Sequence, residues 1–257
     1  MTEIIWNTQE LLQYCPEQVT NKAKIYFKAV QDKIARILYA VERINNYQSS
    51  LPSLISFPDF RKKQLEIVMD LETIAYNLHS LPDVLANIIT ILIINPLIFT
   101  DTSLCFKRDK DINIYSVKDK INVIQTAEYI NIQQKQHLEN LVAAIEKLIK
   151  SSEYEYISAL VNTIKHRNLI DTEYIEKISI SKFIYLNSST PSQNMDDANL
   201  NTNWTLIEFE KDNNNYPAIT IEQLITKYRE NIINLFFLVG QEINNYCLAT
   251  RISNSST

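Results

Sequence analysis

Apolar residues recur along most of this chain every three or four positions, which is the spacing of an amphipathic helix. One such run begins after Pro16 and ends at the polar cluster of residues 45–50, so we expect one long helix there. Its apolar stripe consists of Ile25, Val30, Ile34, Ile37, Val41 and Ile44. A second helical run covers residues 59–79, and its stripe consists of Leu65, Val68, Met69, Leu71 and Ala75.

Residues 84–99, VLANIITILIINPLIF, are the most apolar part of the chain. A helix that crosses a bilayer needs about 20 apolar residues, whereas this run is shorter and includes Asn87, Thr90 and Asn95. We therefore expect a buried core helix and no membrane contact. Pro82 precedes the run, and we expect it to break or kink the chain.

Residues 132–150 have the clearest helical pattern, and Asn131 and Gln134 are placed as a capping box at its start. Ser152 and Glu155 have the spacing of another capping box, which would begin a helix that runs to Arg167.

The apolar period then changes to two, in residues 178–186 and 204–210, which predicts two strands. Residues 187–203 between them are polar, and we expect a mobile loop. Thr220 and Gln223 would cap the last helix, in which Gly240 indicates a close helix crossing.

These elements predict a mainly α protein, a helical bundle with one small antiparallel β pair inserted before the last helix. A chain of 257 residues is near the upper limit for one core, so we expect residues 1–257 to form a single domain. Gly240 is the only glycine, where average usage of about 7% would give roughly twenty. Phosphate-binding and dinucleotide-binding loops need several glycines and are excluded. Asn-Gly and Asp-Gly turns are absent, which argues against an all-β protein.

Charge and cysteine content narrow the class of protein further. The net charge of −5 gives no general attraction to nucleic acid or to an anionic membrane. Cys15, Cys105 and Cys247 are far apart and odd in number, which is typical of reduced thiols in a cytoplasmic protein. The N-terminus lacks the pattern of a signal peptide. We expect neither a cofactor nor a metal, because three scattered histidines lack the spacing of a metal site.

The stretch SALVNTIKHRNLI, residues 158–170, contains the first candidate site. Asn162 and His166 are four residues apart, so their side chains can meet on one face of a helix, along a stripe that also holds Glu155 and Ala159. Lys165 and Arg167 flank this stripe with positive charge. Such a set could orient a phosphate and exchange protons near neutral pH. The alternative is that these cations only complement the dipole at a helix end.

The second candidate site is formed by His79 and Asp83, which lie four residues apart. If the helix continues through Pro82, a paired imidazole and carboxylate would result, a pattern that orients an imidazole or binds a metal. If the helix breaks, Ser80 caps the next helix with Asp83 at its third position, and His79 and Asp83 are not paired. We favour the break because of the proline.

The order of parts resembles bacterial proteins of the HEPN-like kind. It comprises helices, His79-Ser80 to Asp83, Asn162-x-x-Lys165-His166-Arg167, a β pair and a long last helix. The resemblance is to a poorly characterised group with an Asn-x-x-Lys-His-Arg signature, over roughly residues 60–240. It implies a helical bundle that is often dimeric. Its active members are metal-independent ribonucleases of toxin–antitoxin and antiphage systems, and other members only bind RNA or are inert.

By this resemblance His166 would be the general acid–base, Arg167 or Lys165 would stabilise charge on the phosphate, and Asn162 would orient one of them. In the active members an arginine is separated from the histidine by four to six intervening residues, and at those positions before His166 this chain has Ala159, Leu160 and Val161. We therefore expect a non-catalytic interaction protein of a bacterial defence or stress system, which binds a protein partner or forms a homodimer. The alternative is a metal-independent ribonuclease or RNA-binding protein that uses the helix end at residues 162–167.

Overall fold

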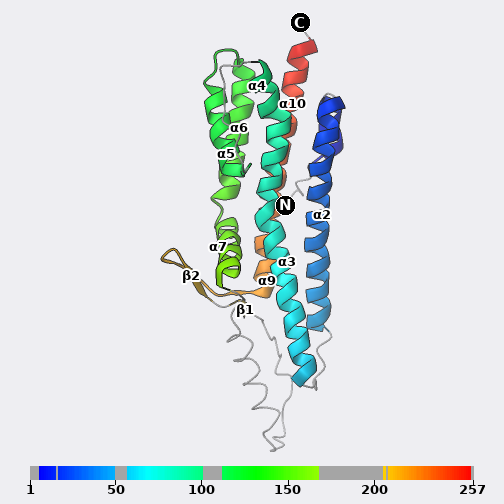
Figure 1. Ribbon diagram of the computed structural model, residues 1–257, viewed down its shortest axis with the longest axis vertical. Coiled ribbons are helices and arrows are strands. Elements are labelled where there is room, and N and C mark those ends of the chain that lie inside the picture. The colour runs from blue at the N-terminus through cyan, green and yellow to red at the C-terminus, as the bar shows by residue number, and fades with distance from the viewer. Residues whose placement is uncertain are drawn as a thin grey trace, which may run out of the picture.

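The computed structural model describes residues 6–15, 17–49, 57–100, 112–167, 205–206 and 208–255. Long helices lie side by side and a β hairpin projects from one side (Figure 1). The mainly α class, with a β pair directly before the last helical segment, is confirmed. The predicted strand at residues 178–186 and the predicted loop at residues 187–203 lie outside the described residues.

The helical elements in chain order are α1 (Thr8–Tyr14), α2 (Glu17–Ser49), α3 (Phe57–Ile89), the π-helical turn η1 (Thr90–Ile94), α4 (Asn95–Thr100), α5 (Ile114–Gln125), α6 (Ile132–Ile149), α7 (Ser152–Arg167), α9 (Ile221–Gln223), the π-helical turn η2 (Leu224–Tyr228) and α10 (Arg229–Ser255). Residues 112–114 have an alternating pattern that would also suit a short strand, but Ile114 is the first residue of helix α5.

Helices α2 and α3 form an antiparallel pair along one side of the bundle (Figure 1). The long helix predicted after Pro16 is confirmed, and most of its predicted stripe is buried. Ile25 is 69% exposed instead, while Ala23 and Phe27 face the core. In α3 the predicted members Leu65 and Met69 are 56% and 59% exposed. The buried stripe of α3 contains Ile67, Leu71, Ile74 and Leu78.

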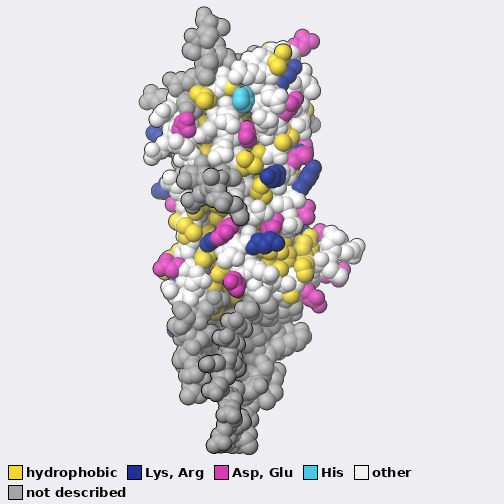
Figure 2. Space-filling model, turned by 180° about the vertical axis from the view of Figure 1, so that it is seen from behind, with side chains coloured by type: hydrophobic (Ala, Val, Ile, Leu, Met, Phe, Trp, Pro, Cys, Tyr) yellow, Lys and Arg dark blue, Asp and Glu magenta, His cyan; other side chains and the backbone are white. Residues whose placement is uncertain are grey.

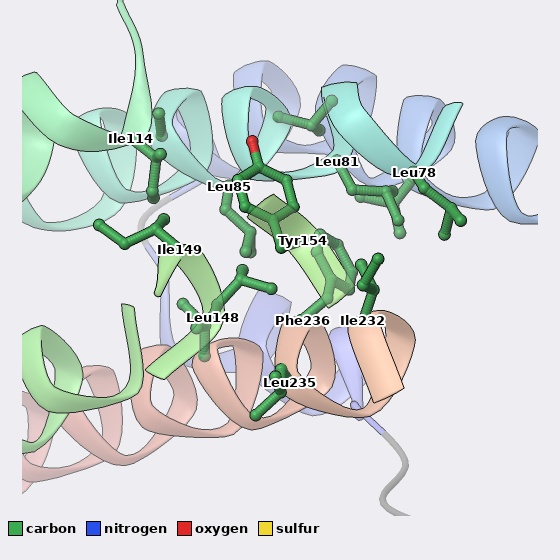
Figure 3. Close-up of a cluster of buried hydrophobic side chains, with 14 of the residues drawn as sticks. Leu78, Leu81, Leu85, Ile114, Leu148, Ile149, Tyr154, Ile232, Leu235 and Phe236 are labelled. Carbon is green, nitrogen blue, oxygen red and sulfur yellow. The ribbon is translucent and has the colours of Figure 1, made fainter. Parts of the chain in front are cut away.

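Most of the apolar run at residues 84–99 lies within the stretch Leu65–Leu97. This is the one helical stretch in the described chain that is long and apolar enough to cross a membrane. However, 56% of its apolar window is buried inside the protein, which is the behaviour expected of a core helix. Residues such as Leu85 from α3, Leu148 from α6 and Phe236 from α10 meet in one apolar cluster, and the ring of Tyr154 from α7 lies among them (Figure 3).

The β hairpin precedes α9 and consists of β1 (Thr205–Leu206), β2 (Phe209–Lys211), β3 (Asn214–Tyr216) and β4 (Ile219–Thr220). β1 pairs with β4 and β2 pairs with β3, both antiparallel. The strand predicted at residues 204–210 is confirmed in part, as the two short strands β1 and β2, which pair with residues that follow them in the chain. The hairpin turn is Asp212–Asn213, with φ of 50° and 63°. Aspartate and asparagine tolerate this left-handed conformation, so the turn forms without glycine.

Two predicted capping boxes are confirmed, at Asn131–Gln134 and at Thr220–Gln223. The box predicted at Ser152 and Glu155 is wrong, because it is the Ser151 hydroxyl that accepts a hydrogen bond from the backbone N–H of Tyr154, at 3.2 Å. The helix after Ser151 still begins where predicted.

Candidate functional site

Helix α3 continues without interruption through Pro82, so the predicted helix break is wrong. A proline inside a helix costs about 3 kcal/mol, through a lost hydrogen bond and a steric clash. Leu78, Leu81 and Leu85 around it are fully buried, and burial of one leucine gains about 1.5–3 kcal/mol. Core packing therefore outweighs the proline and keeps the helix intact.

Ser80 consequently does not cap a new helix. Its hydroxyl donates a hydrogen bond to the backbone oxygen of Tyr76 at 2.8 Å and accepts one from the Lys33 amine at 2.7 Å. The Lys33 contact connects α2 to α3 at the level of the candidate site.

His79 is held against α7 rather than against Asp83. Its imidazole stacks on the Tyr154 ring, with centroids 6.1 Å apart and planes 13° apart, and the Tyr154 hydroxyl donates to the backbone oxygen of His79 at 3.3 Å. The Nδ1 atom is buried and has no hydrogen-bond partner in the described chain. Burial, followed by the charges of Lys165 and Lys211, lowers the pKa of His79, so the imidazole is neutral at neutral pH.

Asp83 is directed toward the start of α5, where its carboxylate accepts a hydrogen bond from the backbone of Ile114. Neighbouring protein atoms raise its pKa by desolvation, and Lys33, Lys165 and this hydrogen bond oppose the rise. No hydrogen bond or ion pair joins Asp83 to His79 within the described residues. The unbroken helix therefore places the two residues on one face without making them an imidazole–carboxylate pair.

Helix α7 extends to Arg167, so Asn162, Lys165, His166 and Arg167 all belong to its last turns. Asn162 is half-buried and Lys165 is exposed, with its amine 6.0 Å from the centroid of the Tyr76 ring. The side chains of His166 and Arg167 lie outside the described part of the structure. Lys165 is thus the one charged member of the predicted helix-end site that can be placed, and it lies beside the α3 face that carries His79 and Asp83.

The stripe of α7 that begins with Glu155 and Ala159 faces a pocket of about 280 Å³. We call this pocket the tyrosine groove. It is lined by Tyr115 of α5, Ile149 of α6, Tyr154, Glu155, Ser158 and Ala159 of α7, and Lys211, Asn214 and Tyr216 of the hairpin. Figure 2 shows hydrophobic side chains gathered where the hairpin meets the helices, with acidic and basic side chains mixed beside them.

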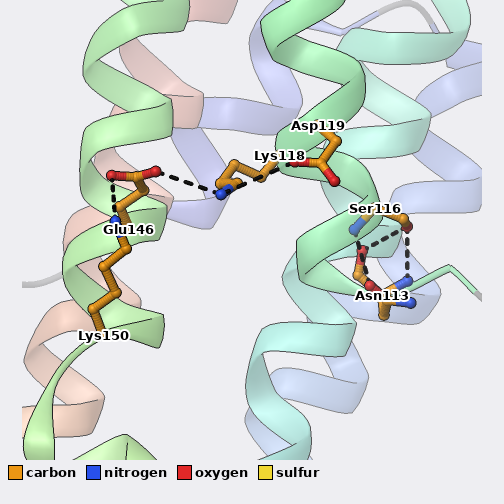
Figure 4. Close-up of polar contacts among 6 residues, drawn as sticks. All are labelled: Asn113, Ser116, Lys118, Asp119, Glu146 and Lys150. Carbon is orange, nitrogen blue, oxygen red and sulfur yellow. Dashed lines mark hydrogen bonds and ion pairs between the residues drawn. The ribbon is translucent and has the colours of Figure 1, made fainter.

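Tyr115 is positioned by the first turn of α5. The Asn113 side chain accepts from the backbone N–H of Ser116 at 2.9 Å, and the Ser116 hydroxyl accepts from the backbone N–H of Asn113 at 3.4 Å (Figure 4). This capping box fixes where the helix begins. Lys118 lies 3.4 Å from Glu146, which also binds Lys150 at 3.0 Å, so ion pairs connect α5 to the end of α6 (Figure 4).

An aromatic cluster attaches the hairpin to α7. The Tyr156 ring contacts the rings of Phe209 and Tyr216 edge to face, at 5.3 Å and 6.0 Å between centroids. Phe209 and Tyr216 are paired across the strands and stack at 4.9 Å. The Tyr156 hydroxyl also donates to the backbone oxygen of Pro217 at 3.2 Å. These contacts hold Lys211 and Asn214, at either side of the turn, over the groove.

The tyrosines of the groove are hydrogen-bond donors at neutral pH. Burial is the main cause that raises the pKa of both Tyr115 and Tyr154, and the Asp83 charge adds to it in each case. The Tyr154 hydroxyl already donates to His79, so the groove offers the Tyr115 phenol, the Ser158 hydroxyl and the Asn214 amide as hydrogen-bonding groups, together with aromatic faces. No group of His, Cys, Asp and Glu that could hold a metal ion occurs among the described residues.

The sequence indicated only part of this arrangement. The stripe of Glu155 and Ala159 was predicted to lead to a site, and these residues do line the groove. Tyr115, Lys211 and Tyr216 were not identified as site residues. The available signals were local ones, namely the Asn113–Ser116 capping pair and the Asp212–Asn213 turn between two alternating segments.

Comparison of the chain with protein-family models, with curated proteins and with solved structures gave no match.

Proposed function

We propose that the protein is a non-catalytic helical interaction protein and that it binds a protein partner through the tyrosine groove. The observation that carries this proposal is the composition of the groove, in which three tyrosines occur together with Ser158 and Asn214. Tyrosine supplies large amphipathic contact area with little loss of conformational entropy, and serine and asparagine supply adaptable hydrogen bonds. Of these residue types, tyrosine is enriched at protein-binding surfaces.

The size of the groove supports a protein partner over a free small molecule. Sites for small ligands typically enclose roughly 300–1,000 Å³ and bury most of the ligand. A groove of about 280 Å³ lies just below that range and has room for one or two side chains of a partner.

The side chains of the second predicted site, His79 and Asp83, also support binding rather than chemistry. The imidazole of His79 is stacked on Tyr154, and the carboxylate of Asp83 binds the start of α5. A general base must lie within hydrogen-bond reach of the group that it deprotonates, and both residues are engaged by their own fold instead.

RNA is the second candidate ligand, and one observation favours it. The positive charges of Lys33 and Lys165 lower the pKa of Asp83, and those of Lys165 and Lys211 lower the pKa of His79. Three cations from α2, α7 and the hairpin thus approach one part of the surface. Lys211 is 3.7 Å from Asp212 and Glu155 lies in the groove, so the charges there are mixed. Phosphate recognition requires an excess of cations, which makes a protein the better-supported ligand.

A photo-crosslinking experiment in cells separates these ligands. Tyr115, which is 51% exposed in the groove, is replaced by a benzophenone amino acid. The matched control carries the same group at Tyr39 of α2, which is 62% exposed and away from the groove. We expect a slower-migrating adduct from position 115 whose size ribonuclease does not change and in which mass spectrometry finds peptides of a partner, with little or none from position 39.

The nature of the adduct decides between the proposals. An adduct of twice the chain mass would indicate that the partner is a second copy of this chain. A ribonuclease-sensitive adduct would show that the ligand is RNA and not a protein. Equal adducts from both positions would contradict the assignment of the groove. The assignment to a defence or stress system depends on the resemblance of the motif order, and the identity of the crosslinked partner tests it.

A further inference from the structure

The segment Trp6–Cys15, here called the N-terminal segment, lies along one face of α10. The Trp6 ring packs directly on Gly240, where any side chain would overlap it. The Trp6 indole N–H donates to the Asn244 side chain at 3.0 Å, and the Asn244 amide donates to the backbone oxygen of Asn7 at 2.9 Å. Gly240, Asn244 and Cys247 follow one another on one helix face at spacings of four and three residues.

Two cysteines meet where this contact ends. Cys15 closes α1, is half-buried, and donates from its thiol to the backbone oxygen of Leu11 at 3.4 Å. Cys247 is buried in α10, with 6% of its surface exposed, and its side chain interacts with that of Cys15 where α1 packs on α10. Both are free thiols. Residues at opposite ends of the chain thus form a pair that their sequence spacing does not suggest.

We propose that Cys15 and Cys247 are a redox-sensitive pair that forms an intramolecular disulfide on reaction with a hydroperoxide. The bond fastens the N-terminal segment to α10. Transient, reversible disulfides of this kind are the usual form in reducing compartments.

The two cysteines take different parts in the reaction. Cys15 is the more accessible thiol, and its hydrogen bond with Cys247 lowers the pKa of Cys15, while burial opposes this. The Cys15 thiolate attacks the terminal oxygen of the hydroperoxide, the S–O bond forms, and the O–O bond breaks. The departing hydroxide or alkoxide takes a proton to become water or alcohol, respectively. The Cys247 sulfur then attacks the sulfenic sulfur and releases its own proton. The S–S bond forms, and the oxygen leaves as water. Each sulfur loses one electron, and the peroxide takes up both.

The disulfide closes a loop that contains nearly the whole chain. A crosslink restricts the unfolded state more strongly the longer the loop that it closes. We therefore expect oxidation to raise the Tm by roughly 5–10 °C, and a thiol reductant to reverse the rise.

Peptide mapping tests the pair directly. Trypsin cleavage after Lys22, Arg229 and Arg251 gives peptides 1–22 and 230–251, each with one cysteine, and Cys105 lies in peptide 64–107. The reduced full-length protein is treated with hydrogen peroxide at low concentration and digested without reductant. We expect peptides 1–22 and 230–251 to be linked, with a mass lower than their sum by two hydrogen atoms, and separated again by dithiothreitol.

Variants of the three cysteines show which two thiols form the disulfide. Cys105→Ser should retain the linked peptides and the Tm rise, and Cys15→Ser, at the half-buried position, should lose both. Cys247→Ala provides the same test from the buried side. Peroxide treatment that leaves Cys15 unlinked, or that links it only to a second chain in a mixture of ¹⁵N-labelled and unlabelled protein, would overturn the proposal.

Discussion

At the residue scale, Gly240 explains how the N-terminal segment reaches the bundle. The Trp6 ring contacts the α10 backbone at this position and packs edge to face with Phe27 and Phe236, each at 5.6 Å between centroids. Glycine inside a helix is about 1 kcal/mol less favourable than alanine. The burial of Trp6, which is 6% exposed, offsets that cost.

Gly240→Ala should destabilise the protein by about 1–3 kcal/mol, the usual cost of an extra methyl group in a packed site, although alanine is the better helix former. Urea unfolding followed by circular dichroism measures the change. In a Trp6→Ala background the space is free, so the same substitution should be neutral or stabilise by up to about 1 kcal/mol. An equal loss in both backgrounds would show that the Trp6 contact is not the cause.

His79 predicts a pH dependence of stability. Because its pKa is lowered in the folded state, the unfolded chain binds the proton more readily, with a pKa of about 6.5. The stability that neutral His79 contributes is complete above that pH and is lost as the pH falls toward the folded pKa. The free energy of unfolding between pH 7.5 and pH 5 should therefore fall more steeply for the wild type than for His79→Gln. Tyr154→Phe, which keeps the ring beside His79, should retain the wild-type slope.

At the element scale, the hairpin shows what local sequence signals can and cannot predict. Capping boxes such as Asn131–Gln134 were predicted because both partners lie within one helical turn. The buried face of α3 was misplaced because a largely apolar helix contains several stripes with helical spacing, and only its neighbours decide which one is buried. Helix α3 also continues through Pro82 because of core packing, which local sequence rules do not take into account. The pairing of the hairpin strands depends on the turn at Asp212–Asn213, which lacks the glycine that would have indicated a hairpin in the sequence.

Asn213→Val should loosen the hairpin, since a left-handed conformation costs an ordinary L-residue about 1–2 kcal/mol and a β-branched residue tolerates it poorly. Amide hydrogen exchange in residues 209–216 should become faster, and binding at the groove should weaken because Lys211 and Asn214 lie beside the turn. Asn213→Gly suits the φ of 63° and should retain slow exchange. Similar exchange rates in both variants would argue against a strained turn.

At the scale of the whole molecule, the tyrosine groove is assembled from parts of the chain that the sequence keeps far apart. Tyr115 comes from the start of α5, Ser158 from α7 and Tyr216 from the hairpin. Sequence patterns identified the α7 stripe because its members share one helix. They could not identify the other walls, because the aromatic cluster around Tyr156 that brings the hairpin to α7 is a tertiary contact.

The balance of charge on the whole molecule leads to the prediction that the protein does not cleave RNA. The chain has 25 Lys and Arg against 30 Asp and Glu, so a polyanion is not attracted over a distance and must be held by local cations. Of the predicted catalytic set, Lys165 rests beside Tyr76, and the residues that would assist it from α3 are engaged elsewhere. Purified wild type and His166→Ala of equal thermal stability should therefore both leave labelled RNA intact in EDTA, beside a metal-independent ribonuclease as positive control. Cleavage by the wild type alone would show that the end of α7 is an active site and would contradict the proposed non-catalytic function, because a binding surface has no need of an imidazole that exchanges protons.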